Sequence, residues 1–182
     1  MTTTAATPTI TSYSVDPVHS TAGFAVRHMV VSTFRGGFED VRGTLDLTGD
    51  EPKLAGHVAV QSVQVKDENL RGHLQSPEFF DAERHPEVSF VSTRVTRGPG
   101  DAVSVDGDLT IKGITRQVVA TGSWNEIEAD ITGNPRIGID LETTIDRIAH
   151  RLDWNAPLPK GGFALANDVT LLVHLELVPK EA

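Results

Sequence analysis

Seven histidines and 25 aspartates and glutamates are the side chains of this 182-residue chain that suit metal binding or proton transfer. Their spacing matches no common catalytic pattern, because the sequence lacks H-E-x-x-H, G-x-S-x-G, P-loop and G-x-G-x-x-G motifs. Neighbouring carboxylates such as Glu39-Asp40 point to opposite faces of a strand, which is the wrong geometry for a shared acid–base site. We therefore predict that the protein is not an enzyme and has no catalytic residues, metal site or cofactor.

The absence of cysteine and the acidic charge exclude further classes. Without Cys, disulfides, thiolate catalysis and Cys-based zinc sites are ruled out. The formal net charge of −9, with no cluster of Lys and Arg, argues against nucleic-acid binding and against electrostatic docking to anionic lipid. No stretch approaches the roughly 18 apolar residues of a membrane-spanning helix, so no stable membrane insertion is expected. The start, M-T-T-T-A-A-T-P-T-I, lacks the features of a signal peptide, which predicts a cytoplasmic protein.

Three polar side chains with hydrogen-bonding capacity lie where strand-like sequence gives way to a helical segment. They are Asn69, Arg71 and His73. Together they suit recognition of the headgroup of a quinone, phenol or phosphate. Helix capping and a solvated helix face are equally good explanations of these residue types. Their role depends on the element that positions them.

That element is the segment 67–93, which opens with the best helical signal in the chain. Leu70 and Leu74 stand four apart, so they share one face of a short helix. Ser76-Pro77-Glu78 then predicts a second helical turn that presents Phe79 and Phe80. His85-Pro86 ends helical structure, because the residue before proline favours extended geometry. We predict a short helical lid that places two aromatic rings against a sheet.

The remainder of the chain is typical of strands and turns. Apolar residues alternate with polar ones in 103–111, 137–145 and 169–177. Helices and strands do not alternate along the chain, which argues against a parallel sheet. We predict an all-β antiparallel barrel of about eight strands with the helical lid, forming a single domain over 11–179. Residues 1–10 are expected to be a disordered leader and 180–182 a C-terminal tail.

A barrel of this size is either packed solid or holds one ligand in its lumen. Several small residues at inward positions favour a cavity, whereas alternating aliphatic residues are equally typical of an ordinary core. The period of two selects lumen and lid candidates for contact with a ligand. They are Phe24, Val26, Phe38, Leu74, Phe79, Phe80, Phe90, Leu109, Ile139, Leu141 and Trp154.

Five blocks of the sequence resemble a known family. R-G-H-L-Q-S-P-E-F-F-D (71–81), followed by H-P-E-V-S-F-V-S-T (85–93), is similar to the signature of the YceI-like, lipid-binding proteins. Y-S-V-D-P-V-H-S-T-A-G-F (13–24), G-D-L-T-I-K-G-I-T-R (107–116) and the pair Trp154-Asn155 also match. The first of these contains the D-P-x-H-S element of the family, in which His19 is predicted to be a turn histidine bonded to backbone.

The resemblance implies a lipocalin-like barrel that holds a polyisoprenoid, a polyprenyl quinone or a fatty-acyl lipid in an apolar tunnel, for carriage or storage. It adds Arg147 to Asn69 and His73 as candidate headgroup ligands. It also implies a homodimer as the possible assembly, with Val119 and Leu172 as candidate interface residues. Arg147 stands where the family has Arg before an Asp-Phe-Gly element. Here the sequence reads D-R-I-A-H-R-L-D-W-N, so that element is missing and a different ligand or loop shape follows.

Two other functions remain open. A solidly packed barrel would act as a protein-interaction or structural module. A metal-dependent enzyme is the less favoured alternative, because the histidines are scattered one per predicted strand. Recovery of a bound lipid would distinguish the lipid-binding function from both of these alternatives.

Overall fold

The computed structural model describes residues 10–180 and contains one short helix and eleven strands. Of the predicted leader (1–10) and tail (180–182), all but Ile10 and Lys180 lie outside the described residues. The strands are β1 (Ser12–Val15), β2 (Thr21–His28), β3 (Ser32–Phe38), β4 (Val41–Asp46), β5 (Lys53–Ala59), β6 (Val63–Gln64), β7 (Glu87–Arg97), β8 (Ala102–Ile111), β9 (Ile114–Ile127), β10 (Arg136–Asp146) and β11 (Leu165–Pro179). The helix α1 spans Glu68–Gln75, and two 3-10 turns are η1 (Val60–Ser62) and η2 (Arg147–His150).

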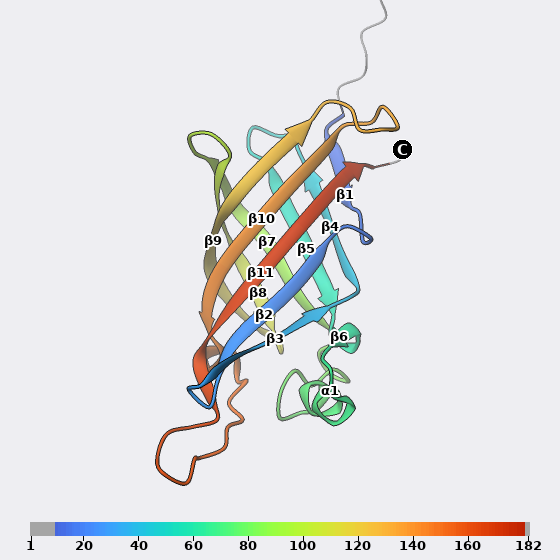
Figure 1. Ribbon diagram of the computed structural model, residues 1–182. Coiled ribbons are helices and arrows are strands. Elements are labelled where there is room, and N and C mark those ends of the chain that lie inside the picture. Colours follow the sequence, from blue (N-terminus) through green and yellow to red (C-terminus); the bar gives the residue numbers. More distant parts are fainter. Residues whose placement is uncertain (1–9, 181–182) are drawn as a thin grey trace, which may run out of the picture.

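The strands form one antiparallel sheet that closes on itself (Figure 1). Strand β1 pairs with β4 on one side and with β11 on the other, which closes the barrel. Strands β1 and β2 pair with successive parts of β11, while β3 and β4 pair with β2 and β1. Strands β5 and β6 are likewise joined through η1. Three pairs of short strands thus act as three long bent ones, and the prediction of an all-β barrel of about eight strands is confirmed.

Alternation of side chains explains why these segments are strands. Along β8, Val103, Val105, Gly107, Leu109 and Ile111 are buried, and the residues that alternate with them are partly exposed. A strand places successive side chains on opposite faces, so one face of β8 lines the barrel interior and the other meets solvent. Within residues 10–180 no helix has the length and apolar character needed to cross a bilayer.

The corner between β1 and β2 is built by the D-P-x-H-S element. Where neither strand pairs with β11, the Oγ of buried Ser20 accepts a hydrogen bond from the backbone N–H of Glu176 (3.0 Å). The N–H of Asp16 donates to the carbonyl of Glu176 (2.8 Å), so the interrupted ladder keeps its bonds. The prediction that His19 bonds to backbone is wrong: its Nδ1 lies 2.8 Å from the Asp16 carboxylate. That carboxylate also accepts from the N–H of Val18 (2.9 Å), as expected of Asp in a tight turn.

The lid segment follows β6 and lies at one end of the barrel, called here the lid end (Figure 1). Asp67 begins α1, because its carboxylate accepts from the N–H of Leu70 (2.8 Å). The predicted second helical turn at 76–80 is wrong. The N–H of Phe80 returns to the carbonyl of Leu74 (3.0 Å), and Asp81 adopts a left-handed φ of 54°. Residues 77–80 therefore form a tight turn, which still directs Phe79 and Phe80 into the protein.

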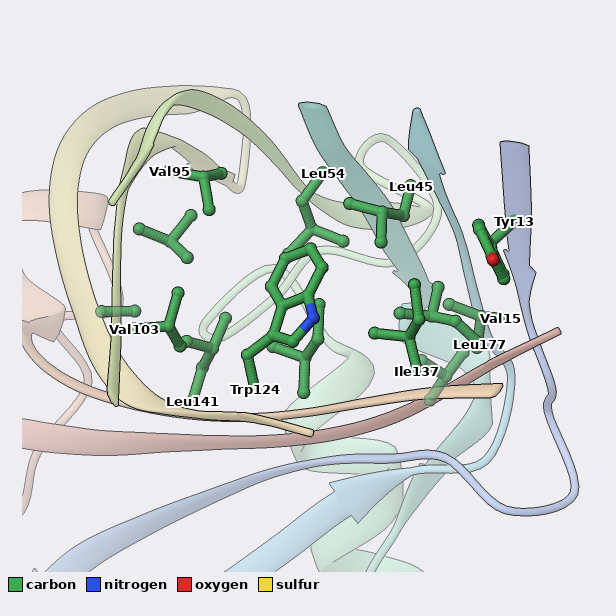
Figure 2. Close-up of a cluster of buried hydrophobic side chains, with 14 of the residues drawn as sticks. Tyr13, Val15, Leu45, Leu54, Val95, Val103, Trp124, Ile137, Leu141 and Leu177 are labelled. Carbon is green, nitrogen blue, oxygen red and sulfur yellow. The ribbon is translucent and has the colours of Figure 1, made fainter. Parts of the chain in front are cut away.

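The interior holds two hydrophobic clusters, one at each end of the barrel. Figure 2 shows the cluster at the end opposite the lid, where Trp124 lies among Leu54, Ile137 and their neighbours. The indole N–H donates to Glu126 (2.8 Å), and the guanidinium of Arg97 lies 4.7 Å from the ring centre. A buried aromatic ring whose polar atom is satisfied closes this end of the barrel.

Candidate functional site

A cavity of about 160 Å³ lies inside the barrel and shares its walls with both hydrophobic clusters. Its lining is contributed by strands all round the barrel and is almost entirely apolar. The apolar lining side chains are Val15, Ala22, Phe38, Val41, Leu54, Val58, Val88, Phe90, Leu109, Val118, Ala120, Leu141, Leu171, Val173 and Leu175. Cavities with such walls stay dry and accept apolar groups.

Small residues on the inner face explain why the lumen is not filled. Ala22 and Ala120 project only a methyl group into the cavity. A β-carbon at Gly107 would overlap the ring of Phe90, so this glycine allows the ring to lie against the wall. Gly36 makes the same room for the ring of Phe24. Aromatic rings laid against the wall leave space along the barrel axis.

Three phenylalanine rings separate the cavity from the lid. Phe38 lines the cavity and lies 5.9 Å from the ring of Phe24 and 5.8 Å from the ring of Phe80. Phe24 and Phe80 are 6.4 Å apart, so the three rings form a closed triangle. Phe80 comes from the lid and the other two from β2 and β3. We call Phe24, Phe38 and Phe80 the ring plug, because they link Phe80 of the lid to the cavity wall at Phe38.

A second aromatic group joins the lid to the loop 151–164. The imidazole of His73 lies edge-on to Phe79 (4.9 Å) and to Trp154 (4.8 Å), and the last two rings are 5.5 Å apart. The Nε2 of His73 lies 2.7 Å from the carboxylate of Glu78. Lys112, from the β8–β9 turn, donates to the carbonyl of Pro77 (2.7 Å). The lid thus contacts two other loops, through Trp154 of the loop 151–164 and Lys112 of the β8–β9 turn.

Arg147 is the one buried cation at this end among the described residues. Its guanidinium donates to the carbonyl of Ala166 (2.8 Å), to that of Trp154 (2.9 Å) and to that of Leu152. Burial lowers the pKa of Arg147 from its ordinary value, but a guanidinium stays charged at every physiological pH. The Nη2 atom has no hydrogen-bond partner within residues 10–180. Arg147 therefore organises the loop 151–164 and retains one free donor group.

The structure separates the predicted ligand residues into groups. Phe38, Phe90, Leu109 and Leu141 line the cavity. Phe24, Leu74, Phe79, Phe80 and Trp154 belong to, or pack against, the lid-end cluster. Ile139 is buried in the opposite cluster, and Val26 is buried on β2. Asn69 is exposed on α1, away from the cavity lining.

The predicted ligand residues omitted much of the cavity lining, including Ala120, which was expected only as a small inward-facing residue, and they omitted Trp124 nearby. Both lie on the inner face of β9, where Val118, Ala120 and Trp124 alternate with polar or exposed neighbours. The signal was the same period of two that identified the other strands. It was weak because Gly122 interrupts the series; a β-carbon there would overlap the backbone of Asp140.

One group of potential metal ligands exists in the described part of the chain, formed by Asp16, His19 and Glu176. It lies at the β1–β2 corner, where the guanidinium of Arg136 already bonds Asp16 (3.4 Å), Asp130 (2.5 Å) and Glu176. The hydrogen bond to Asp16 raises the pKa of His19, and the same bond lowers the pKa of Asp16. These side chains form an ion network that stabilises the corner, and none of them lines the cavity.

His150 gives the protein a predictable dependence on pH. It is fully buried in η2 with Nδ1 3.1 Å from the carbonyl of Ile114, and burial lowers the pKa of this imidazole from its usual 6.5. Below about pH 6.5 the unfolded chain binds a proton at this imidazole that the folded protein does not bind. The free energy of unfolding therefore decreases as the pH is lowered, until the pH reaches the folded pKa. We expect His150→Gln to flatten this acid-side slope in urea unfolding.

The control for this prediction has the opposite sign. The pKa of His19 is raised, so its contribution is complete below about pH 6.5 and is lost as the pH rises through the folded value. His19→Gln should therefore steepen the increase of stability with pH. Equal slopes for wild type and His150→Gln would contradict the assignment of the slope to His150.

Comparisons with known proteins agree with this geometry. Residues 13–177 match the model of the YceI-like domain. A UPF0312 protein of Staphylococcus aureus is 30% identical over 164 residues, which are 88% of this chain and 93% of that protein. The crystal structure of Burkholderia cenocepacia BcnA superposes with a TM-score of 0.76 at 22% identity, covering 89% of this chain and 98% of that one.

A second solved structure carries a ligand class in its description. It is a polyisoprenoid binding domain from Saccharophagus degradans implicated in plant cell wall breakdown, with a TM-score of 0.65 and 13% identity. The match covers 93% of this chain and 99% of that domain. At such identities these likenesses establish the shared fold.

Proposed function

The chain belongs to the YceI-like domain family, and from that membership we propose that its barrel binds the apolar tail of a long-chain amphiphile. The tail is a polyisoprenoid, a polyprenyl quinone or a fatty-acyl chain. The observation that carries the proposal is the apolar cavity inside a closed barrel, separated from the lid by three rings. The description of the Saccharophagus domain as polyisoprenoid binding supports the choice of ligand class.

The physical case rests on burial of methylene groups. Each buried CH₂ contributes roughly 0.8 kcal/mol, so a long tail is held by apolar area with few polar contacts. A binding protein of this kind needs no nucleophile and no acid–base pair. The role is carriage or storage of the lipid.

The size of the cavity indicates how a long tail enters. A dry cavity of about 150 Å³ accepts a group the size of benzene, whereas sites for larger ligands measure roughly 300–1,000 Å³. The volume of about 160 Å³ therefore holds one short section of a tail. A longer tail requires the ring plug to open, and Phe80 is the ring that moves with the lid. We infer that the lid swings aside during loading and that the tail replaces its rings.

The test is extraction of the purified protein with organic solvent, followed by mass spectrometry of the extract. We expect one long-chain amphiphile at about one molecule per protein, because the barrel has a single lumen. A barrel-free protein purified from the same host in parallel controls for adventitious lipid. An empty extract, together with no uptake of added polyprenyl quinone or fatty acid, would instead identify a packed barrel that serves as an interaction module.

Two finer expectations go with the proposal. A cytoplasmic location and a homodimer remain predictions, which cell fractionation and light scattering of the purified protein would test. Neither is needed for the cavity to bind a tail.

A further inference from the structure

Two neighbouring loops at the lid end expose large apolar side chains. In the β2–β3 hairpin, Val30 is 73% exposed and Val31 is 83% exposed, and Met29 is exposed beside them. In the loop 151–164, Phe163 is 61% exposed. The N–H of Met29 donates to the carbonyl of Ala164 (2.7 Å), so the two loops are joined. In Figure 1 both reach the lower left of the barrel, on the side away from α1.

The hairpin carries these side chains at a conformational cost. Met29 and Val30 have φ values of 49° and 65°, and the N–H of Val31 donates to the carbonyl of His28 (3.2 Å), as in a type I′ turn. Such turns strongly favour Asn-Gly, since the left-handed region is unfavourable for side chains branched at Cβ. An exposed Met-Val pair in this turn is therefore worse for folding than a polar pair. Strain retained at an exposed position indicates a role for the side chains themselves.

Several polar backbone groups of the hairpin tip form hydrogen bonds within the protein. Besides the bonds of Met29 and Val31, the carbonyl of Val30 accepts from the guanidinium of Arg27. Polar backbone groups that enter a lipid environment must have their partners within the protein. Three polar backbone groups of the tip, the N–H of Met29, the N–H of Val31 and the carbonyl of Val30, already meet this condition.

Charge distinguishes this corner from the rest of an acidic protein. The chain has a net charge of −9, yet residues 17–38 and 154–167 contain no Asp or Glu. The hairpin carries Arg27 and Arg35, and the second loop carries Lys160. The nearest acidic residues along the second segment are Asp153 and Asp168, just outside it. The net charge and the lack of a Lys and Arg cluster predicted no docking to anionic lipid. The folded chain nevertheless brings these two segments together, so that three cations and the exposed apolar side chains share one corner, with Asp153 and Asp168 at its edge.

We propose that this corner, formed by the β2–β3 tip and the loop around Phe163, docks reversibly onto an anionic lipid bilayer. Exposed aliphatic and aromatic side chains enter the interface, and the three cations attract the acidic headgroups. The proposal concerns the outer surface and does not depend on occupancy of the cavity. If the barrel also binds a tail, docking brings the lid end to the membrane from which the tail comes.

Partition of the protein to vesicles of phosphatidylcholine, with and without phosphatidylglycerol, tests the proposal by co-sedimentation. We expect binding that increases with phosphatidylglycerol and weakens with salt. Met29→Asn combined with Val30→Gly should lower the partition coefficient by roughly ten-fold or more. The same variant should unfold at a higher urea concentration, because it places Asn-Gly in a turn that favours it. Opposite changes in binding and stability are not expected of a merely structural tip.

Matched variants complete the design. Ile131→Asn removes a fully exposed aliphatic side chain from the β9–β10 turn, at the other end of the barrel, and should leave partition unchanged. Phe163→Ser should weaken binding independently of the hairpin. Lys160→Glu should weaken it by roughly five-fold, and only for vesicles that contain phosphatidylglycerol.

Three results would overturn the proposal. The first is wild-type protein that does not bind vesicles containing phosphatidylglycerol. The second is unchanged partition of the Met29→Asn, Val30→Gly variant. The third is a change of oligomeric state in that variant by light scattering, which would show that a second copy of the chain covers the corner.

Discussion

Ala120→Phe is expected to weaken binding of a long tail by about 100-fold while the barrel remains folded. Ala120 is buried on the inner face of β9 and lines the cavity, so a phenyl ring at this position occupies the space that a tail would use. Loss of burial for a few methylene groups lowers the affinity by about 100-fold. Overpacking costs roughly 1–3 kcal/mol of stability, which a complete barrel tolerates. Mass spectrometry of the extract measures the bound lipid, titration with polyprenyl quinone measures the affinity, and urea unfolding measures the stability.

The adjacent residue provides the control for the cavity. Val119 is exposed on the outer face of the same strand, so Val119→Phe adds more apolar surface without entering the lumen. We expect this variant to bind the tail as wild type does. A tail that binds Ala120→Phe with unchanged affinity must lie outside the cavity, and the proposed function would then lose its basis.

Arg147→Met is expected to be the most destabilising single substitution of a polar residue at the lid end. The variant leaves the carbonyls of Leu152, Trp154 and Ala166 without their donor. An unpaired buried polar group costs roughly 1–3 kcal/mol, so we expect a loss of at least about 3 kcal/mol in urea unfolding. The loop 151–164 should also become sensitive to proteolysis, because these carbonyls fix its path.

Arg94→Met is the matched substitution, since Arg94 is exposed on β7. Its unfolding free energy should stay within about 0.5 kcal/mol of wild type. A loss below about 1 kcal/mol for Arg147→Met would show that water replaces the guanidinium at the three carbonyls. Normal stability combined with lost tail binding would assign Arg147 to the headgroup, as the family resemblance implies.

The lid illustrates how far local sequence signals extend. The apolar pair Leu70 and Leu74 predicts α1 correctly, and the structure adds the Asp67 cap at its start. The second helical turn was wrong because the hydroxyl of Ser76 bonds back to the carbonyl of His73 (2.8 Å) and ends α1. Ser is equally suited to begin a helix and to satisfy the last carbonyls of one, so its type does not distinguish the two.

The cavity depends on information that no single strand contains. Ile139 and Leu141 both face inward on β10 and both belong to the cluster opposite the lid, yet only Leu141 lines the cavity. A period of two identifies the face of a strand but not the level along the barrel axis. That level follows from the pairing of β10 with β9 and β11, in which Ile139 lies opposite Trp124 and Leu175.

By itself the sequence determined that this protein is an all-β antiparallel barrel with a helical lid, because the alternation of side chains in strands and the four-residue spacing of Leu70 and Leu74 are local signals. Only the tertiary structure decided three further features: the ring plug, the three carbonyls around Arg147 and the cationic, apolar corner. Each joins residues from separate elements. The physical reason is closure of the sheet, since the register between distant strands sets which side chains meet and where the lumen stays open.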